Sequence, residues 1–326
     1  MSNNTIDYIE LPSHSNAFFF INWRCVSEGY GCLGVTESYD VIQHSNDWLY
    51  LIGDGNYRDT GPILNHIKQN NQHVEFIDED IIPFITAFPA SIHGYAGALS
   101  ILTDYINHLS VYEGKTVALY QGAQKGIHDI IKYFQQIDVI KAKIIFLEHD
   151  VIYKFRSITI IPNTLHSYFE SIPIRDSISK ILQQYIFDYT LPNEYNISDD
   201  VRNIAILKHH GSSISSSMGA ISIDTARNFC NKHNLKLIEP AELNEIQLIK
   251  MISNCEKLIC SWGTTFMKNF IYISDKCKEV IVYIIGAEFT SEYNHLVNNE
   301  KIINQFKNAK FTYQIVDTEL TNAIYF

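Results

Sequence analysis

The residues best suited to bind an anion form a short stretch, Ser261-Trp262-Gly263-Thr264-Thr265, which follows an apolar run and opens a segment with helical spacing. Free backbone N–H groups at the start of a helix favour phosphate, and a glycine lets the backbone approach the anion closely. Thr264 and Thr265 can cap the helix or donate hydrogen bonds to phosphate oxygens. A plain helix cap with a glycine needed for packing is the competing interpretation.

A second polar stretch, Lys208-His209-His210, follows the apolar run 204–207. If that run is a parallel strand, the stretch lies at its carboxyl end, where ligands bind in such sheets. A lysine and two imidazoles can neutralise a diphosphate or assist its departure. The alternative is a solvated polar loop. Because the side chains of adjacent residues diverge, we expect no metal site here.

Three further residues are candidates for chemistry. His93 stands at the head of a predicted helix, where a neutral imidazole can act as a general base toward a hydroxyl. Asp104 is the second catalytic candidate, although it lies about three turns further along, too far to pair directly with His93. Glu239, before Pro240, is placed to hold a ribose or sugar hydroxyl. A capping or core histidine is the competing interpretation of His93.

Two groups of acidic residues are interpreted as exposed turns instead of sites. They are Asp78-Glu79-Asp80 and Asp199-Asp200. The first has the form of a DxD metal motif, but such triplets arise by chance. We therefore predict no metal site in either group, and the sequence indicates no bound cofactor.

The elements that must position these residues are clearest in the C-terminal half. Short runs rich in branched residues alternate with segments of helical spacing, as expected for strands buried on both faces. The runs are 204–207, 235–238, 257–260 and 279–285, and the helical segments are 222–234, 242–254 and 264–273. This alternation predicts a parallel sheet with its ligand at the carboxyl ends of the strands.

The N-terminal half predicts a second α/β layer. The expected strands are 18–23, 48–52, 74–77, 116–120, 143–147 and a pair at 151–153 and 157–161; the expected helices are 61–70, 93–110 and 125–136. A helix at 176–189 and a polar, proline-containing linker follow. Beyond 285 we expect a helix at 290–306 and a strand at 311–316. The predicted domains are 1–195 and 196–326, and the first is the predicted binding half for a substrate that accepts a transferred group. A cleft between two such halves is a common ligand site.

Bulk composition excludes several classes of protein. A net charge of −11 without a Lys/Arg cluster argues against nucleic-acid binding. No apolar stretch reaches the roughly 18 residues that span a bilayer, and the N-terminus lacks the pattern of a signal peptide. The 6 cysteines form no CxxC pair, so we expect reduced, buried thiols. The sequence predicts a cytoplasmic protein, and leaves open the oligomeric state and a peripheral association with membranes.

With these stretches placed, roughly residues 90 to 285 resemble glycosyltransferase family 61, which is associated with capsular polysaccharide. The resemblance is carried by the order and spacing of four stretches: Ile92-His93-Gly94-Tyr95, Ala205-Ile206-Leu207-Lys208, Leu237-Ile238-Glu239-Pro240-Ala241-Glu242-Leu243, and Leu258 through Ser261-Trp262-Gly263-Thr264-Thr265 to Lys268 and Asn269. Trp262 stands where the family has histidine, Lys268 where it has asparagine, and Gly97 where it has aspartate.

The resemblance implies two facing Rossmann-like domains (the GT-B fold), inversion at the anomeric carbon, and chemistry that usually needs no metal ion. The expected protein is a transferase that moves a sugar from a nucleotide-sugar donor to a hydroxyl of a glycan in polysaccharide biosynthesis. Lys208, Gly263, Thr264 and Thr265 would surround the donor diphosphate, and Lys268 would belong to the same donor site. Two alternatives stay open: a transferase of CMP-linked acid sugars on the same scaffold, and a non-catalytic module that binds a nucleotide or a glycan.

Overall fold

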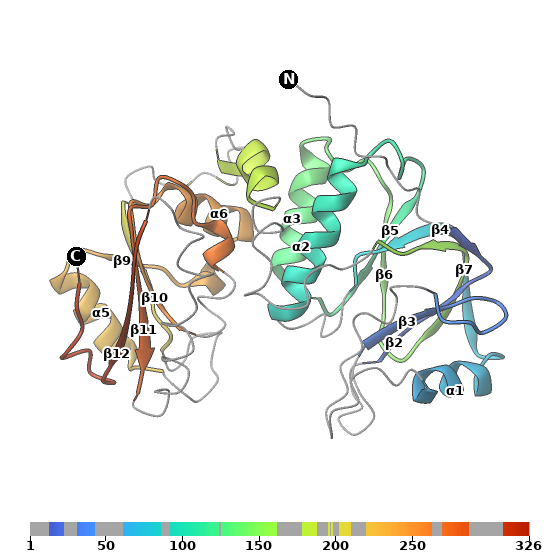
Figure 1. The fold of residues 1–326 in the computed structure, drawn as a ribbon, viewed down its shortest axis with the longest axis horizontal. Helices are drawn as coiled ribbons and strands as arrows, with labels where there is room; N and C mark the ends of the chain where they lie inside the picture. Colours follow the sequence, from blue (N-terminus) through green and yellow to red (C-terminus); the bar gives the residue numbers. More distant parts are fainter. Residues whose placement is uncertain are drawn as a thin grey trace. The chain divides into compact units, whose positions relative to one another are not determined.

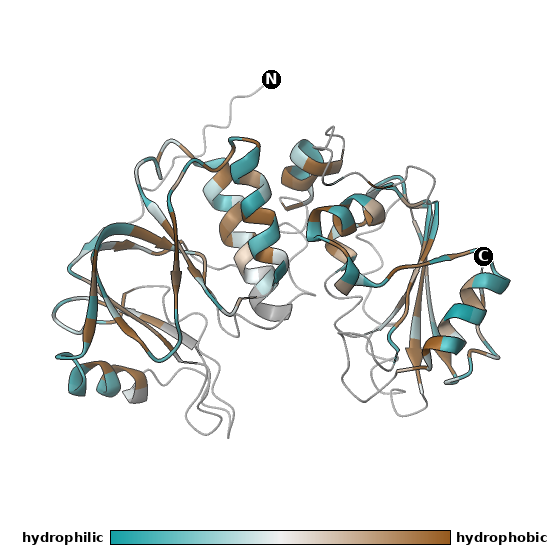
Figure 2. Cartoon of the chain, turned by 180° about the vertical axis from the view of Figure 1, so that it is seen from behind, coloured by the Kyte–Doolittle hydropathy of each residue, from teal (hydrophilic) through white to brown (hydrophobic). Residues whose placement is uncertain are grey.

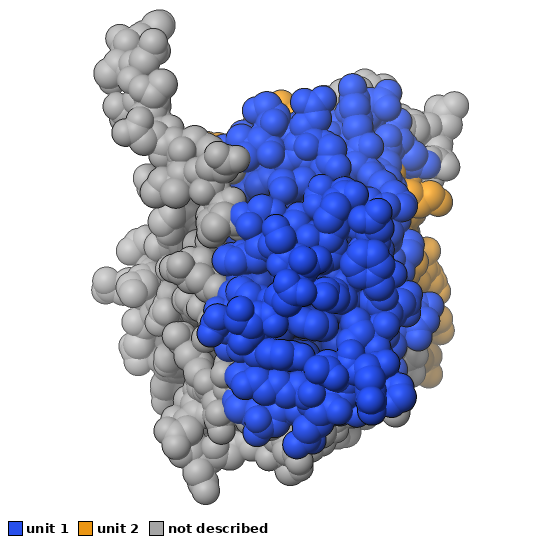
Figure 3. Space-filling view, turned by 90° about the vertical axis from the view of Figure 1, so that its right-hand side faces the viewer, with its two compact units in different colours: residues 1–124, 134–165 blue, residues 125–133, 166–326 orange. Residues whose placement is uncertain are grey.

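The structure is a computed structural model of the chain. It describes residues 13–22, 31–42, 61–85, 92–123, 125–161, 178–187, 195, 197, 202–209, 220–262, 269–286 and 309–325. Two compact units divide the chain: Met1–Gln124 with Phe134–Leu165, and Lys125–Tyr133 with His166–Phe326 (Figure 3). The predicted boundary between residues 195 and 196 falls where few residues are described, and it stays a prediction.

The first unit is built on a mixed sheet. Its strands are β1 (Ser13–Ser15), β2 (Phe18–Asn22), β3 (Gly31–Val35), β4 (Val74–Pro83), β5 (Thr116–Tyr120), β6 (Ile144–Leu147) and β7 (Ile152–Thr159). They lie in the order β3-β2-β7-β4-β5-β6, with β1 also beside β7. The pairs among β7, β4, β5 and β6 are parallel, whereas β1 and β2 run antiparallel to β7, and β3 antiparallel to β2.

Three helices belong to this part of the chain: α1 (Gly61–Gln69), α2 (Ile92–Asn107) and α3 (Lys125–Gln136), the last of which contributes residues to both units. A core beneath α1 joins it to β2 and β3 through Ile63, Ile67, Phe18, Phe20, Leu33 and Val35. The helices predicted at 61–70, 93–110 and 125–136 are confirmed as α1, α2 and α3, although α2 ends at Asn107. The predicted strand 48–52 lies outside the described residues.

Two predictions for this unit are wrong. Asp78-Glu79-Asp80 is not a turn but part of β4, where the register against β7 shifts between Ile77 and Asp80. The expected strand pair at 151–153 and 157–161 is one strand, β7. Pairing with β7 both before and after the register shift carries β4 through polar residues that, taken alone, favour turns, because tertiary context overrides local preference.

The second unit is built on a wholly parallel sheet. Its strands are β8 (Asn203–Ile206), β9 (Lys236–Leu237), β10 (Lys257–Ser261), β11 (Glu279–Ile285) and β12 (Lys310–Val316). They lie in the order β9-β8-β10-β11-β12, and every pair is parallel. In this unit's own chain order the arrangement is 2-1-3-4-5, the order of one of the common doubly wound folds.

Helices cover both faces of this sheet (Figure 1). One face carries α5 (Ile223–Lys232), whose Ala226, Phe229 and Cys230 join Ala205, Ile259, Ile281 and Tyr283 in a single buried cluster. The helix α6 (Glu245–Asn254) lies on the opposite face and buries most of its apolar residues. Since both faces are covered, the central strands β8, β10 and β11 are mainly apolar, and Figure 2 colours such residues brown.

Capping residues define where the helices start. Ser222 accepts a hydrogen bond from the Thr225 amide before α5, and Asn244 and Gln247 form a capping box at the start of α6. The unit also contains the short helices η3 (Pro240–Glu242) and η4 (Phe270–Tyr272). An α-helical stretch at 178–182 continues into the π-helical turn η1 (Gln183–Phe187), within the helix predicted at 176–189. The predicted helix at 290–306 lies outside the described residues.

The thiol prediction is confirmed for four cysteines. Cys230, Cys255, Cys260 and Cys277 are free and buried. The Cys25 residue and the Cys32 side chain lie outside the described part. Among the helices that the structure describes, none is long and apolar enough to cross a membrane.

Candidate functional site

Polar residues gather where β8 and β10 end. These two strands are parallel neighbours, so Lys208 and His209, which follow β8, lie at the same edge of the sheet as Ser261 and Trp262. From β8 the chain continues to β9 on one side, and from β10 it continues to β11 on the other. This edge is therefore the topological switch point of the sheet, the place where ligands bind in open parallel α/β folds.

Hydrogen bonds fix the start of the loop after β8. The Lys208 amide donates to Ser261 Oγ at 2.9 Å, and the Lys208 carbonyl accepts from the Ile221 amide at 3.1 Å. His209 and Ile221 form a parallel bridge, so these two residues lie side by side. The Trp262 amide donates to the Tyr283 carbonyl at 2.7 Å, which extends the ladder beyond β10.

Lys208 is a buried lysine, with only 8% of its surface exposed. Desolvation by burial lowers the pKa of its ammonium group. A cation in such surroundings interacts strongly with an anion, because little water screens the pair. The position therefore suits a phosphate better than an exposed surface lysine would.

His209 and Glu239 join the ends of β8 and β9. His209 Nε2 lies 2.7 Å from Glu239 Oε2, and the side chains are 7% and 21% exposed. Glu239 stands two residues after β9, and Pro240 begins η3 directly behind it. The other carboxylate oxygen, Glu239 Oε1, is buried and accepts no hydrogen bond in the described part of the chain.

Asn269 presents a second buried acceptor after β10. Its side chain is 2% exposed, and its Oδ1 has no hydrogen-bond partner among the described residues. It precedes η4, whose Tyr272 hydroxyl donates to Glu245 Oε1 at 2.7 Å, at the start of α6. Buried acceptors without partners are uncommon in proteins. Glu239 follows β9 and Asn269 follows β10, the two strands that flank β8.

Several predicted site residues are outside the described part of the chain. These are His210, Gly263, Thr264, Thr265 and Lys268. The amide cradle expected at 263–265 therefore stays a prediction. Of the donor-side candidates, the structure brings together Lys208 with Ser261, and His209 with Glu239.

The two catalytic candidates lie far apart on α2. His93 is in the first turn, and its side chain is outside the described set, whereas Asp104 is in the last turn. Asp104 accepts a 2.9 Å hydrogen bond from the Tyr112 hydroxyl and lies 3.4 Å from His108 Nδ1. These contacts hold the Asp104 side chain at the end of the helix, and its catalytic role stays a prediction. The structure does not bring it near His93.

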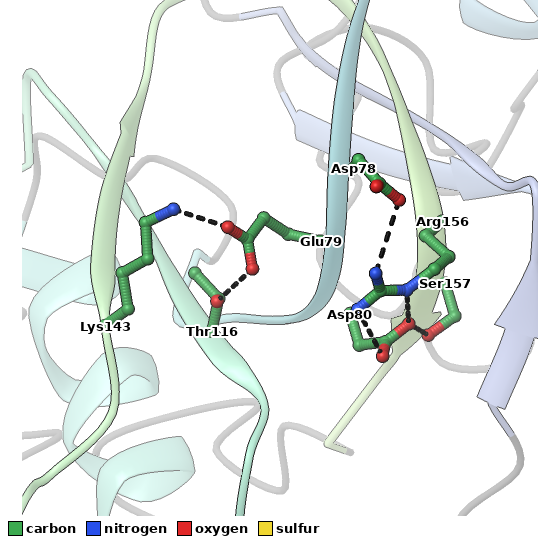
Figure 4. Close-up of polar contacts among 7 residues, drawn as sticks. All are labelled: Asp78, Glu79, Asp80, Thr116, Lys143, Arg156 and Ser157. Carbon is green, nitrogen blue, oxygen red and sulfur yellow. Dashed lines mark hydrogen bonds and ion pairs between the residues drawn. The ribbon is translucent and has the colours of Figure 1, made fainter.

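The acid triplet in β4 is occupied by ion pairs (Figure 4). Arg156 donates to both oxygens of Asp80, at 3.0 and 2.8 Å, and reaches Asp78 at 3.3 Å. The Ser157 hydroxyl donates to Asp80 Oδ1. The hydrogen bonds from Arg156 lower the pKa of Asp80 to about 2, against the opposing effect of burial.

The middle residue of the triplet has its own partners. Glu79 accepts hydrogen bonds from Lys143 and, at 2.8 Å, from the Thr116 hydroxyl, which together lower its pKa. Among the described residues no group of three or more His, Cys, Asp or Glu side chains is arranged to hold a metal ion. The triplet pairs with Arg156 of the neighbouring strand β7 and with Lys143, which directly precedes β6. Sequence inspection missed this because those cations lie far away along the chain.

Fold and site together define an α/β protein whose C-terminal unit has a doubly wound parallel sheet with a polar switch point. No protein-family model matches the chain, and no curated protein matches it in sequence. The likeness to glycosyltransferase family 61 therefore stays a prediction from the quoted residues.

Proposed function

We propose that the protein is an inverting glycosyltransferase that moves a sugar from a nucleotide-sugar donor to a hydroxyl of a surface glycan, such as a capsule, a lipopolysaccharide or a glycoprotein glycan. The observation that supports this best is the buried Lys208, anchored to Ser261 at the switch point of a parallel sheet. Ligands with phosphate groups bind at such an edge, and the C-terminal unit is therefore the proposed donor-binding half.

The reaction requires charge stabilisation more than covalent help from the protein. The acceptor oxygen attacks the anomeric carbon and loses its proton to a base, while the bond from that carbon to the diphosphate oxygen breaks. The nucleoside diphosphate leaves with the electron pair of that bond. Lys208 is the described residue proposed to stabilise the growing negative charge, together with the backbone amides of 263–265. His93 is the proposed base.

The proposal includes a wider architecture. It assigns the donor to the C-terminal half and the acceptor to the N-terminal half, in the GT-B arrangement of two facing Rossmann-like domains. It also assigns the leaving-group stabilisation to side chains and amides without a metal ion.

Calorimetry with the diphosphates of uridine, guanosine, adenosine and cytidine, and with CMP, tests the donor site directly. One nucleoside diphosphate is expected to bind, and Lys208→Met is expected to lower the affinity for it at least tenfold. A tenfold loss equals about 1.4 kcal/mol, and a charge-assisted contact contributes this much or more. Lys236→Met is the matched control, because Lys236 is an exposed lysine of the adjacent strand β9. No heat with any nucleotide would contradict the proposal.

The same panel separates the alternatives. Binding of CMP in preference to every diphosphate would indicate a transferase of CMP-linked acid sugars. Nucleotide binding without donor hydrolysis or transfer, tested with the matching nucleotide sugar, would indicate a non-catalytic module.

A further inference from the structure

The pair of His209 and Glu239 leaves one carboxylate oxygen unused. Glu239 Oε2 lies 2.7 Å from His209 Nε2, so this oxygen has its donor. Glu239 Oε1 is shielded from solvent and has no hydrogen-bond partner in the described part of the chain. A buried, charged acceptor without a donor is costly, and the cost is removed when a ligand supplies the donor.

The chemistry of a carboxylate limits what this ligand group can be. An ionised carboxylate oxygen only accepts hydrogen bonds, so its partner must be an N–H or O–H group. A phosphate group cannot be the partner of Glu239, because the phosphate and the carboxylate are both negative and repel each other. An anionic group of the ligand would instead bind Lys208, which directly precedes His209 in the chain. The edge of the sheet therefore combines a cation for an anionic group with an acceptor for a neutral hydroxyl.

The position of Glu239 in the sheet selects one kind of hydroxyl. It follows β9, the second strand of its unit, which lies beside the first strand, β8. In doubly wound nucleotide-binding sheets an acidic residue near the end of the second strand accepts a hydrogen bond from the ribose. We propose that Glu239 Oε1 accepts a hydrogen bond from a ribose hydroxyl of the nucleotide, while His209 holds Oε2 and so orients the carboxylate. This inference rests on the proposed function, since it requires that a nucleotide binds.

A purely structural pair would behave differently. If His209 and Glu239 only joined the ends of β8 and β9, replacing Glu239 would change stability and would not alter the preference among nucleotides. A solvent molecule bound at Oε1 would likewise give no preference for a ribose over a deoxyribose. Discrimination between these sugars is thus the informative readout.

The experiment uses the full chain and the nucleoside diphosphate that binds best, chosen from those of uridine, guanosine, adenosine and cytidine. Its 2′-deoxy and 3′-deoxy forms are titrated into the wild type, into Glu239→Gln and into the control Glu242→Gln. Glu242 is an exposed glutamate in η3, three residues away, and its substitution makes the same change in charge. If Glu239→Gln does not fold, Glu239→Asp replaces it, because the shorter side chain keeps the charge but withdraws the oxygen.

The wild type is expected to bind at least one deoxy form about tenfold to a hundredfold more weakly than the ribonucleotide, as loss of a hydrogen bond to a charged group implies. In Glu239→Gln, or in Glu239→Asp, that preference shrinks to within about twofold, and Glu242→Gln keeps it. Equal binding of all three forms by the wild type, or an undiminished preference in the Glu239 variant, overturns the inference and leaves the proposed function standing. Failure of every diphosphate to bind the wild type overturns both.

Discussion

The Lys208 backbone amide lies 2.9 Å from Ser261 Oγ, and both residues are buried. This single hydrogen bond ties the loop after β8 to the last residue of β10. It also fixes the backbone of the lysine that we propose as the phosphate-binding cation. The position of Lys208 therefore depends on its hydrogen bond to the last residue of β10.

Ser261→Ala should destabilise the protein by about 1–3 kcal/mol, because the buried Lys208 amide loses its acceptor. Urea denaturation measures this change in the free energy of unfolding. Ser15→Ala, at an exposed position of the edge strand β1, serves as the control and should change stability by less than about 0.5 kcal/mol. Equal stability of Ser261→Ala and the wild type would show that the bond does not anchor the loop.

Nucleotide affinity should depend on pH through Lys208. Burial lowers the pKa of this lysine in the free protein, and a bound diphosphate would raise it again by favouring the charged form. Nucleotide affinity is then highest at pH values below the pKa of Lys208 in the free protein. It falls by up to about tenfold per pH unit between that pKa and the higher pKa of the complex.

Calorimetry between pH 7 and pH 10 measures this dependence. Lys208→Met is expected to bind weakly and with little change in affinity over the same range, whereas Lys236→Met should follow the wild type. An alkaline loss of affinity that persists unchanged in Lys208→Met would assign the titration to another group.

Asp80 should contribute to the acid sensitivity of the first unit. Its pKa is about 2 in the folded protein, below the ordinary value of 3.8, chiefly because Arg156 donates hydrogen bonds to it. A carboxyl group whose pKa is lower in the folded than in the unfolded protein stabilises the fold at pH values above its unfolded pKa. This contribution is lost as the pH falls from about 4 toward 2. Asp80→Asn should therefore lower stability at pH 7 and reduce its fall in that window.

Denaturation curves at pH 7, 4 and 2.5 measure this effect, with Asp78→Asn as the control. Asp78 has a single 3.3 Å contact with the same arginine, and its side chain is 70% exposed. Its substitution should have the smaller effect at every pH. Equal effects of the two variants would mean that the two-point contact with Asp80 adds nothing.

The four buried cysteines should be unreactive in the folded protein. Burial raises the pKa of Cys230 to about 12 and also raises the pKa of Cys260, so these two thiols form little thiolate near neutral pH. The hydrogen bond with Cys255 lowers the pKa of Cys277, and this thiol is protected by its burial, with 1% of its surface exposed. In a Cys25→Ser, Cys32→Ser variant, a thiol reagent such as DTNB should label none of the four within minutes at pH 8. In urea it should label all of them. Rapid labelling of the folded variant would contradict the burial of these side chains.

Local patterns predicted the elements of the fold better than their pairing. The strand Thr116–Tyr120, the helix Lys125–Gln136 and the strand Glu279–Ile285 match their predicted bounds, because each is a strongly patterned segment with clear ends. The parallel sheet of the C-terminal unit also followed from alternating strands and helices. The antiparallel pairing of β1 and β2 with β7 did not follow from the pattern, because β7 is far away in the sequence.

The candidate residues could be named from the sequence, but the contacts between them could not. Lys208, His209, Glu239 and Ser261 were all recognised from their places after apolar runs. That His209 meets Glu239 depends on β9 lying beside β8, and a sequence does not state strand order. The role of Asp78-Glu79-Asp80 depends in the same way on Lys143 and Arg156, which belong to distant segments.

A crystal structure of the protein with the nucleoside diphosphate that gives the largest heat tests the central claim most directly. The account predicts the diphosphate at the carboxyl ends of β8 and β10, beside Lys208, with the ribose within hydrogen-bonding distance of Glu239. A nucleotide bound elsewhere, for example on the mixed sheet of the first unit, would contradict it.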